Sequence, residues 1–347
     1  MAHSKLTISG KELLVHKAVG DPDFGAKSVL VTDTWDYVTM WMKRSHKKEA
    51  LFYWDQARHF YDASLSLSNT SSPLTSYYCF LNAVKALLSV KALPITAHHG
   101  VSGKTTNNKA ALSNEEVYFL PRGVLSGLCA YLGEPTNRQQ HSLKDLLYNL
   151  PYIHRAYHLT FPSQSELFIP IADPCFVKKA DSTEAWFCAE ISDKKYQNQH
   201  TVNKLSTKFE QDVGVTNAFI IRRKDRFRWR LGKTNKTSNL NRLRTYHAVI
   251  RKHVVYIHAP SRLWYIKRDN NVPHIVDRSS LAMTFAAMHR LSELARYNPL
   301  LLSKHFDSQH NWLLSEFIAT AAHQFIDEIS SEITGHEFLV PGRKGGS

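Results

Sequence analysis

Apolar residues recur at helical spacing in both terminal thirds of the chain. Near the N-terminus, Trp35, Val38 and Met42 are three and four residues apart and follow Asp33, which predicts an amphipathic helix with an acidic N-cap. Ser72-Pro73 places a capping residue before a proline that suits the first helical position. Helices are predicted over residues 34–42, 47–67, 73–90, 123–131 and 142–149, over a run capped by Asp277 or Ser279 that ends before Asn298-Pro299, and over 308–334 with Gly335 as C-cap.

The middle of the chain has a different pattern, because β-branched and aromatic residues cluster there and turns are frequent. A polar helix is predicted over 201–212, and polar loops over 98–104 and 233–241. Turns are expected at 224–225, between the third and fourth strands below, and at 259–262, between the last two. The strands are predicted over residues 167–171, 185–191, 218–222, 226–231, 254–258 and 263–267.

These patterns predict an α+β fold, in which a helical bundle built from both ends of the chain carries a β-rich basic insertion. Residues 1–160 form the mainly helical N-terminal part, and residues 161–275 the basic β-rich part. Residues 276–340 form C-terminal helices that pack on the N-terminal part. Residues 341–347 are polar and glycine-rich, which predicts a disordered tail.

The distribution of charge adds a functional prediction to this fold. The formal +14 of the 347-residue chain is concentrated in the β-rich part. Residues 201–270 contain 17 Lys and Arg but only 4 Asp and Glu. Within them, Arg226-Phe-Arg-Trp-Arg-Leu231 alternates guanidinium groups with apolar side chains, and a strand sends these two sets to opposite faces. A row of three arginines with few local acids predicts a surface that binds a polyanion.

Composition and hydropathy indicate the cellular compartment of the protein. No run approaches the roughly 18 to 20 apolar residues that span a bilayer, and the first residues lack a secretory leader. The four scattered cysteines are typical of small buried side chains in a reducing compartment. We therefore expect a cytoplasmic protein without a membrane anchor, a metal site or a cofactor.

Several short motifs near the helical ends resemble a known family. They are Ser72-Pro73-Leu74, Tyr77-Tyr78, Leu81-Asn82, Lys85-Ala86-Leu87 and His99-Gly100, followed by Ala295-Arg296-Tyr297-Asn298-Pro299. Together they resemble the YaaC-like family of bacterial proteins. The resemblance implies a bacterial origin, a scaffold similar to HEPN-type helical bundles, and a place beside phage-defence genes; it transfers no catalytic residue.

Two kinds of nuclease site are alternatives to simple binding. An HEPN-like ribonuclease needs an Arg followed by four to six residues and a His, and Arg242–His247, Arg251–His258 and Arg268–His274 match. Chance alone gives roughly three matches in a chain with this many Arg and His, so the spacing carries no weight. A metal-dependent nuclease would combine Asp173 or Asp181 with Glu190 or with Asp193-Lys194-Lys195.

The leading hypothesis is a phosphate-backbone-binding subunit of a bacterial anti-phage defence assembly, with DNA or RNA as ligand and a protein partner in the assembly. Alternatives are the nuclease above and a non-catalytic scaffold that docks an acidic protein partner. Catalytic residues stay unassigned. The predicted nucleic-acid-binding residues are Arg222, Arg223, Arg226, Arg228, Trp229, Arg230, Arg242, Arg244, Arg251 and Lys252, because arginine suits bidentate phosphate contact and aromatic rings stack on bases.

Overall fold

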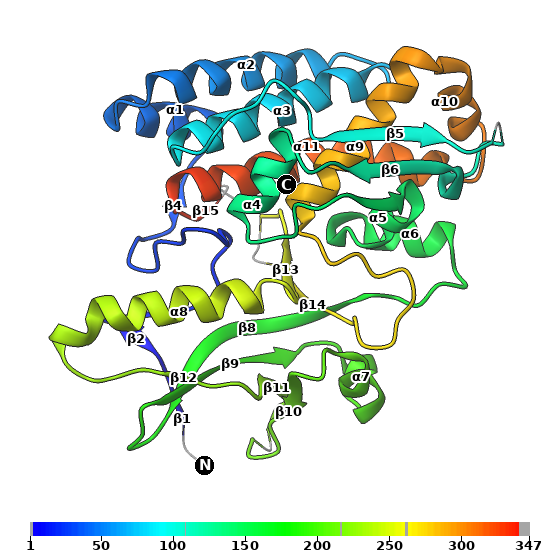
Figure 1. Cartoon of the computed structure of the whole chain (residues 1–347). Helices are drawn as coiled ribbons and strands as arrows, with labels where there is room; N and C mark the ends of the chain where they lie inside the picture. The colour runs from blue at the N-terminus through cyan, green and yellow to red at the C-terminus, as the bar shows by residue number, and fades with distance from the viewer. Residues whose placement is uncertain (1–2, 108, 216, 261–262, 340–347) are drawn as a thin grey trace, which may run out of the picture.

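The computed structural model describes residues 3–107, 109–215, 217–260 and 263–339 and confirms the α+β class. A helical layer lies on one side of the molecule and a large curled antiparallel sheet on the other (Figure 1). The predicted tail at 341–347 lies outside the described residues. So does part of the predicted turn at 259–262.

The helical layer is built from both ends of the chain around one central helix. Helix α3 (Ser72–Val90) is apolar on nearly all sides and contacts α2 (Lys48–Ser64), α9 (Ser280–Tyr297) and α11 (Asn311–Thr334). A helix that is apolar all round belongs inside a protein, so α3 forms the centre of the layer. The layer is completed by α1 (Thr34–Arg44) and α10 (Pro299–Phe306).

Local sequence explains where these helices begin and end. The Asp33 side chain accepts a hydrogen bond from the backbone N–H of Trp35 and caps α1. Ser279 caps α9 in the same way through the N–H of Ala282. Gly335 ends α11 with a φ of 75°, a conformation that glycine adopts without strain. These predicted boundaries are confirmed.

A small sheet that the sequence patterns did not predict lies against the helical layer. Residues 98–104 were expected to form a polar loop, but the structure places a strand there. The strand is half-buried against its neighbour and α9, so tertiary contacts override its polar composition. The sheet contains β5 (Val101–Thr105), β6 (Glu115–Phe119) and β7 (Gln139–Ser142). Around it lie α4 (Val124–Tyr131), α5 (Leu143–Tyr148) and α6 (His154–Thr160), with short 3₁₀ turns at Leu112–Asn114 and Pro151–Ile153.

A buried ionic cluster ties this small sheet to the helices. The Glu115 carboxylate is fully buried and accepts hydrogen bonds from Arg290 Nη2 at 2.7 Å and Nε at 3.1 Å. Thr105 Oγ1 and His305 Nε2 complete its environment at 2.9 and 3.1 Å. Burial disfavours the charged carboxylate, but the bonds from His305 and Arg290 outweigh it and lower the pKa of Glu115.

The large sheet has the strand order β10-β11-β9-β8-β14-β13, with β1 paired to β8 and β12 paired to β9. All these pairs are antiparallel. The strands are β1 (His3–Lys5), β8 (Phe168–Lys179), β9 (Glu184–Ile191), β10 (Phe209–Gln211), β11 (Ile220–Arg223), β12 (Phe227–Arg228), β13 (Val254–Ile257) and β14 (Leu263–Lys267). The predicted turn at 224–225 does not form a hairpin, because β11 and β12 both pair with β9.

Two further segments differ from the sequence predictions. The expected helix over 201–212 is shorter, α7 (Gln199–Lys204), and is followed by β10; a 3₁₀ turn at Lys194–Tyr196 precedes it. The expected loop at 233–241 is a 3₁₀ turn (Lys233–Asn235) and the start of α8 (Lys236–Ile250), which lies across the large sheet (Figure 1). Asn239 explains why this polar stretch is helical: its side chain bonds the backbone N–H and C=O of Arg230 at 3.0 and 2.7 Å.

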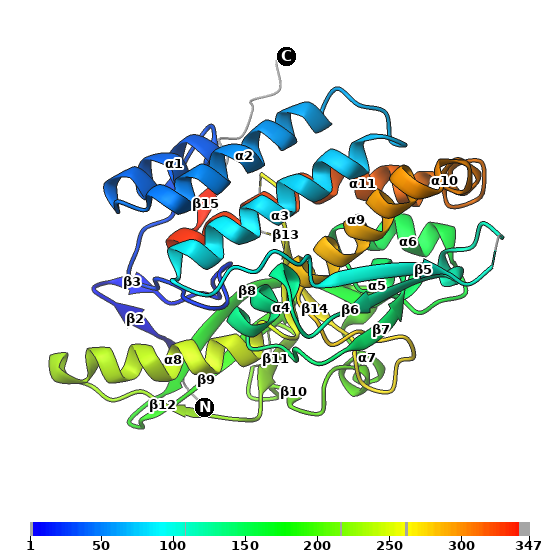
Figure 2. The same ribbon diagram turned by 45° about the horizontal axis from the view of Figure 1, so that its top comes forward.

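The N-terminal segment between β3 (Lys11–Glu12) and β4 (Val29–Leu30), residues 13–28, joins the helical layer to the large sheet. Hairpin strands β2 (Thr7–Ile8) and β3 precede it, and β4 pairs in parallel with the C-terminal β15 (Phe338–Leu339). Between them, the backbone N–H groups of Val19 and Gly20 donate to the Glu332 carboxylate at 2.6 and 3.0 Å. Figure 2 shows this segment between the helical layer and the large sheet.

Candidate functional site

The predicted basic residues do not form one continuous cationic face. Two of them are paired with the protein's own acids: Arg222 contacts Glu210 at 2.9 Å and Asp212 at 3.2 Å, and Arg223 contacts Asp225 at 2.8 Å. The expectation that local acids are too few to neutralise these arginines is therefore wrong here. Strand pairing places Glu210 of β10 opposite Arg222 of β11, and the turn after β11 places Asp225 beside Arg223.

Two more predicted residues are turned inward. Trp229 is buried against Phe227, so its ring is not free to stack on a base. Arg251 donates through Nη1 to the Val254 carbonyl and through Nη2 to the Lys17 carbonyl at 3.2 Å. Burial of this guanidinium lowers its pKa.

A smaller group of arginines faces outward around the edge strand β12. Phe227 and Trp229 are buried while Arg228 and Arg230 are exposed, as the alternation predicted. Arg226 lies over the Trp186 ring at 4.4 Å, and Arg242 of α8 approaches Asn239, the residue that binds the backbone of Arg230. We call Arg226, Arg228, Arg230 and Arg242 the arginine edge. Arg244 lies apart from it and donates to the Pro22 carbonyl at 3.3 Å.

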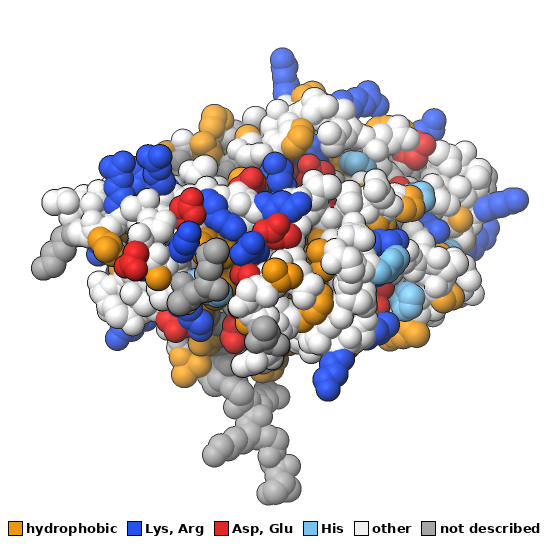
Figure 3. Space-filling model, turned by 90° about the horizontal axis from the view of Figure 1, so that it is seen from below, with side chains coloured by type: hydrophobic (Ala, Val, Ile, Leu, Met, Phe, Trp, Pro, Cys, Tyr) orange, Lys and Arg blue, Asp and Glu red, His pale blue; other side chains and the backbone are white. Residues whose placement is uncertain are grey.

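Acids are scarce but present near the arginine edge. Glu184 lies opposite Arg228 across the β9–β12 pair, yet the two charged groups form no ion pair. On the underside of the sheet, Lys and Arg side chains are interspersed with Asp and Glu (Figure 3). The cationic surface is thus narrower than the charge count of the segment suggests.

The histidines of the three Arg–His matches are engaged elsewhere. His247 is fully buried, with Nε2 at 3.1 Å from the backbone of His16. His258 Nδ1 lies 3.3 Å from Asp327, and His274 Nδ1 lies 3.0 Å from Asp145. The histidine of each match therefore makes contacts within the fold.

Glu190 of β9 lies opposite Ala172, the neighbour of Asp173, whereas the other acids of the metal-dependent alternative lie in turns. Asp173 sits in a bulge of β8 with a φ of 47°, and Asp181 lies in the turn after that strand. Asp193 accepts the backbone N–H of Lys195 at 2.9 Å, which gives it a structural role. Over the residues that the structure describes, no three His, Cys, Asp or Glu side chains are placed to share a metal ion.

The His98-His99-Gly100 segment has a structural role. Gly100 has a φ of 81°, a conformation that glycine adopts readily, and it lies ten residues beyond the end of α3 at Val90. The carbonyls of His98 and His99 accept the first N–H groups of α4, from Val124 and Leu125, at 2.9 and 3.0 Å.

A polar pocket lies between the helical layer and the large sheet. Of its charged residues, only Arg251 and Lys252 are among the binding residues predicted from the sequence. The pocket has about 70 Å³ of interior space for water molecules. Because about 10–15 Å³ of such space holds one water, the pocket has room for several waters or a phosphate-sized group. Its charged and hydroxyl-bearing residues are Glu134, Arg251, Lys252, Tyr256, Lys267, Asp277, Arg278, Ser279, Ser280, Glu328 and Glu332.

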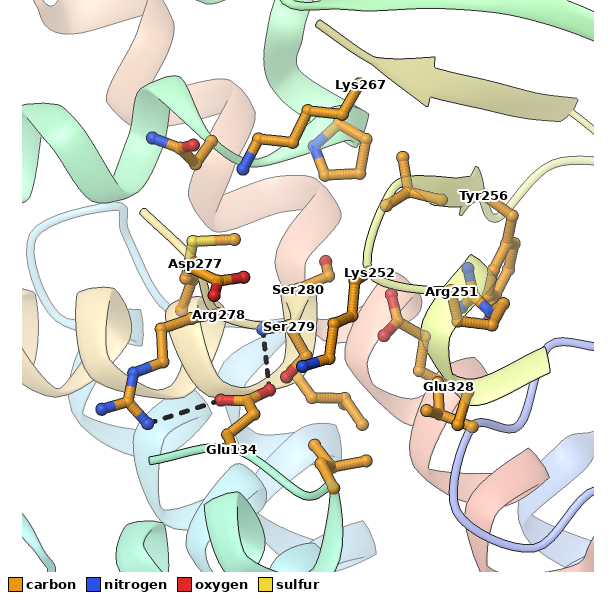
Figure 4. A pocket seen from close by; sticks show the side chains of 18 of the residues that line it. Glu134, Arg251, Lys252, Tyr256, Lys267, Asp277, Arg278, Ser279, Ser280 and Glu328 are labelled. Carbon is orange, nitrogen blue, oxygen red and sulfur yellow. Dashed lines mark hydrogen bonds and ion pairs between the residues drawn. The ribbon is translucent and has the colours of Figure 1, made fainter. Parts of the chain in front are cut away.

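Two lysines dominate the pocket wall. Lys252, just after α8, is exposed and extends into the pocket (Figure 4), and it has no hydrogen-bond or ion-pair partner within the described part of the chain. Lys267, the last residue of β14, is buried and donates to the Val276 carbonyl at 3.0 Å. Burial lowers the pKa of Lys267 to about 8, against the opposing effect of Asp269 and Asp277.

The acids of the pocket are mostly buried and resist ionisation. Burial raises the pKa of Glu328 to about 7, although Gln324 donates a hydrogen bond to it at 2.6 Å. Burial likewise raises the pKa of Glu332 and Glu134. Glu134 accepts the backbone N–H of Ser279 at 2.8 Å and lies 3.5 Å from Arg278, which is itself held by Gln139.

Perturbed ionisable groups that meet in one pocket are typical of functional sites. These residues come from α8, β14, α9, α11 and the loop after α4, so no local motif predicts their meeting. One signal was available: Glu328 and Glu332 occupy buried positions one turn apart on α11, where an amphipathic pattern predicts apolar residues.

Comparisons with known proteins identify the family. No helix in the described part of the chain combines the length and apolar character needed to cross a bilayer. No curated protein and no solved structure matches the chain. The family model described as "YaaC-like Protein" matches residues 26–333, which is most of the sequence. The chain therefore belongs to the YaaC-like family.

Proposed function

We propose that this protein binds the phosphate backbone of a nucleic acid through the arginine edge. The observation that carries the proposal is the exposure of Arg228 and Arg230, which have no ion-pair partner in the described part of the chain. Their apolar neighbours Phe227 and Trp229 are anchored in the core. The two guanidinium groups are thereby presented to solvent from an anchored strand.

The chemistry of the arginine edge suits phosphate contact. A guanidinium group presents a planar fork that matches phosphate oxygens in bidentate geometry. Arg242 adds a third side chain, because Asn239 links the backbone of Arg230 to the same turn of α8. Because Trp229 is buried and the Trp186 ring is covered by Arg226, the expected contact is to the backbone and is independent of sequence.

The proposal is tested by the salt dependence of binding to labelled single-stranded and duplex DNA and RNA. Each phosphate held contributes about −0.7 (single strand) to −0.9 (duplex) to the slope of log affinity against log salt. Changing Arg228 and Arg230 to Glu should weaken binding at least tenfold and make the slope about 1 to 2 less steep. Arg226 is left intact, because it covers Trp186 and bonds the Arg223 carbonyl.

A matched control makes the same charge change elsewhere. Lys48 and Lys304 are exposed on α2 and α10 of the helical layer, so the double change to Glu should leave the slope unaltered. Equal affinity of the Arg228/Arg230 variant and wild type would rule out the arginine edge as the binding surface. Loss of binding in both double variants would show only a non-specific effect of net charge.

We further propose that the protein works as a subunit of a larger bacterial assembly with a role in phage defence. This part rests on the family resemblance and on the basic charge of the chain. Purification of the native protein under mild salt should recover a protein partner and nucleic acid together. Recovery of an acidic protein partner alone, with no nucleic acid, would favour a docking scaffold instead.

A further inference from the structure

The polar pocket between the helical layer and the large sheet contains hydrogen-bond donors that the described part of the protein leaves unused. The Lys252 amine has no partner in the described part of the chain. The Lys267 ammonium has three protons to donate, and one goes to the Val276 carbonyl. The Ser280 hydroxyl oxygen and Arg251 Nε are both buried and have no hydrogen-bond partner among the described residues.

The buried members of this set, on Lys267, Ser280 and Arg251, are costly unless a partner satisfies them. A buried polar group without a partner costs about 1–3 kcal/mol, and a charged group costs more. In the close view of the pocket, Ser280 lies between Lys267 and Lys252 (Figure 4). An acceptor with several oxygens, placed between them, would bond groups from β14, α8 and α9 at once.

The charge of the pocket favours an anion over a cation. Four basic residues, Arg251, Lys252, Lys267 and Arg278, line it together with Glu134, Asp277, Glu328 and Glu332. Burial disfavours the charged form of Glu134, Glu328 and Glu332. Asp277 is exposed and marks, with Lys252, the side on which the pocket opens to solvent.

We propose that this pocket binds the phosphate group of a nucleotide, with Lys252, Lys267 and Ser280 as its ligands. The phosphate fits the interior space, and we place the nucleoside on the side of Lys252 because that residue is exposed to solvent. The same chemistry serves a free mononucleotide and the 5′-phosphate end of an oligonucleotide. This site lies at the C-terminal end of α8, whereas Arg230 and Arg242 of the arginine edge contact Asn239 near its start.

Isothermal titration calorimetry of the full chain tests the proposal. The probes are inorganic phosphate, AMP, a 5′-phosphorylated dinucleotide and the same dinucleotide with a 5′-hydroxyl. Wild type should bind the phosphorylated probes, and Lys252→Gln and Ser280→Ala should each weaken that binding at least tenfold. Lys304→Gln, an exposed lysine on α10, is the matched control and should bind as wild type does.

The outcomes separate the sources of the phosphate and the two proposals. Binding of AMP assigns the pocket to free nucleotides, and binding of the phosphorylated dinucleotide alone assigns it to nucleic-acid ends. The Arg228/Arg230 variant should retain this binding, so failure of the arginine edge leaves the pocket intact. No binding of any phosphorylated probe, or equal binding by wild type and Lys252→Gln, would overturn the proposal.

A pH series with sulfate gives a second readout, because sulfate does not titrate in the range used. The groups facing the pocket are Arg251, Lys252, Tyr256, Lys267, Arg278, Glu134, Asp277, Glu328 and Glu332. Between pH 6 and 9, Glu328 gains negative charge around pH 7 and Lys267 loses positive charge around pH 8. Sulfate affinity should therefore fall steadily as pH rises; a constant or rising affinity would exclude Lys267 as a ligand.

Discussion

Glu328→Gln is the substitution that most directly tests the electrostatics of the pocket. Glu328 is buried on α11, accepts a hydrogen bond from Gln324, and has Arg251 as a favourable neighbour. Glutamine keeps the size of the side chain and an oxygen that accepts from Gln324. The substitution therefore removes mainly the ability to ionise.

The expected effect follows from the shift of the Glu328 pKa, from the ordinary value of 4.5 to about 7 in the folded protein. A carboxyl group whose folded pKa is raised contributes stability below the unfolded pKa and loses it as pH rises through the folded pKa. At about 1.4 kcal/mol per pH unit, wild type should lose about 3 kcal/mol relative to the variant between pH 4.5 and pH 7. Above pH 7 the difference should stay constant.

Urea unfolding followed by tryptophan fluorescence, at pH 5, 6, 7 and 8, measures this difference. Stability of Glu328→Gln relative to wild type should rise from pH 5 to pH 7 and level off by pH 8. The same substitution at Glu316, on the first half of α11 and outside the pocket, controls for the chemical change. Parallel stability curves for wild type and Glu328→Gln would refute the argument that burial raises this pKa.

Two further substitutions test packing that the structure makes specific. Glu115→Gln should cost about 1.5–3 kcal/mol in urea unfolding, because Arg290 loses its hydrogen bonds to a buried carboxylate but keeps its ion pair with Glu293; a loss under about 1 kcal/mol, as expected for Glu116→Gln, would contradict this. Gly123→Ala should abolish or strongly reduce soluble folded protein, because φ is 134° and a Cβ would lie 2.2 Å from the backbone nitrogen of Gly100. Gly133→Ala, with φ of 69° and open space around it, is the control and should cost about 1–2 kcal/mol in thermal or urea unfolding; equal behaviour of the two alanine variants would argue against the close contact.

The periodicity of apolar residues predicts most helices and strands, because the local sequence pattern of each element agrees with its environment in the folded protein. Strand β14 was predicted at its observed bounds, since Leu263–Lys267 is a short β-branched and aromatic run between turn residues. The start of α8 was missed, because Asn, Thr and Ser are helical there only through the Asn239 contact with Arg230. Strand β5 was missed for the same reason, since its pairing with β6 is a tertiary contact.

The functional residues were less predictable than the fold, because charge along a chain does not reveal charge in space. The number of arginines in the β-rich part can be read from the sequence, but their pairing cannot. Arg222 and Arg223 meet acids that strand pairing and the following turn bring close. Lys267 and Glu328 are 61 positions apart and meet only because β14 and α11 line the same pocket. Detecting them from sequence would require treating each charged residue in an otherwise apolar face as a candidate.

The N-terminal segment has a consequence for the order of folding during synthesis. Its partners, Asp327 and Glu332 on α11 and Phe338 on β15, are among the last described residues to leave the ribosome. Residues 17–20 therefore cannot make these contacts until α11 and β15 have been synthesised. The pocket closes only then, since Val19 and Glu332 both line it. Nascent chains stalled before α11 should thus carry a folded sheet without a finished binding pocket.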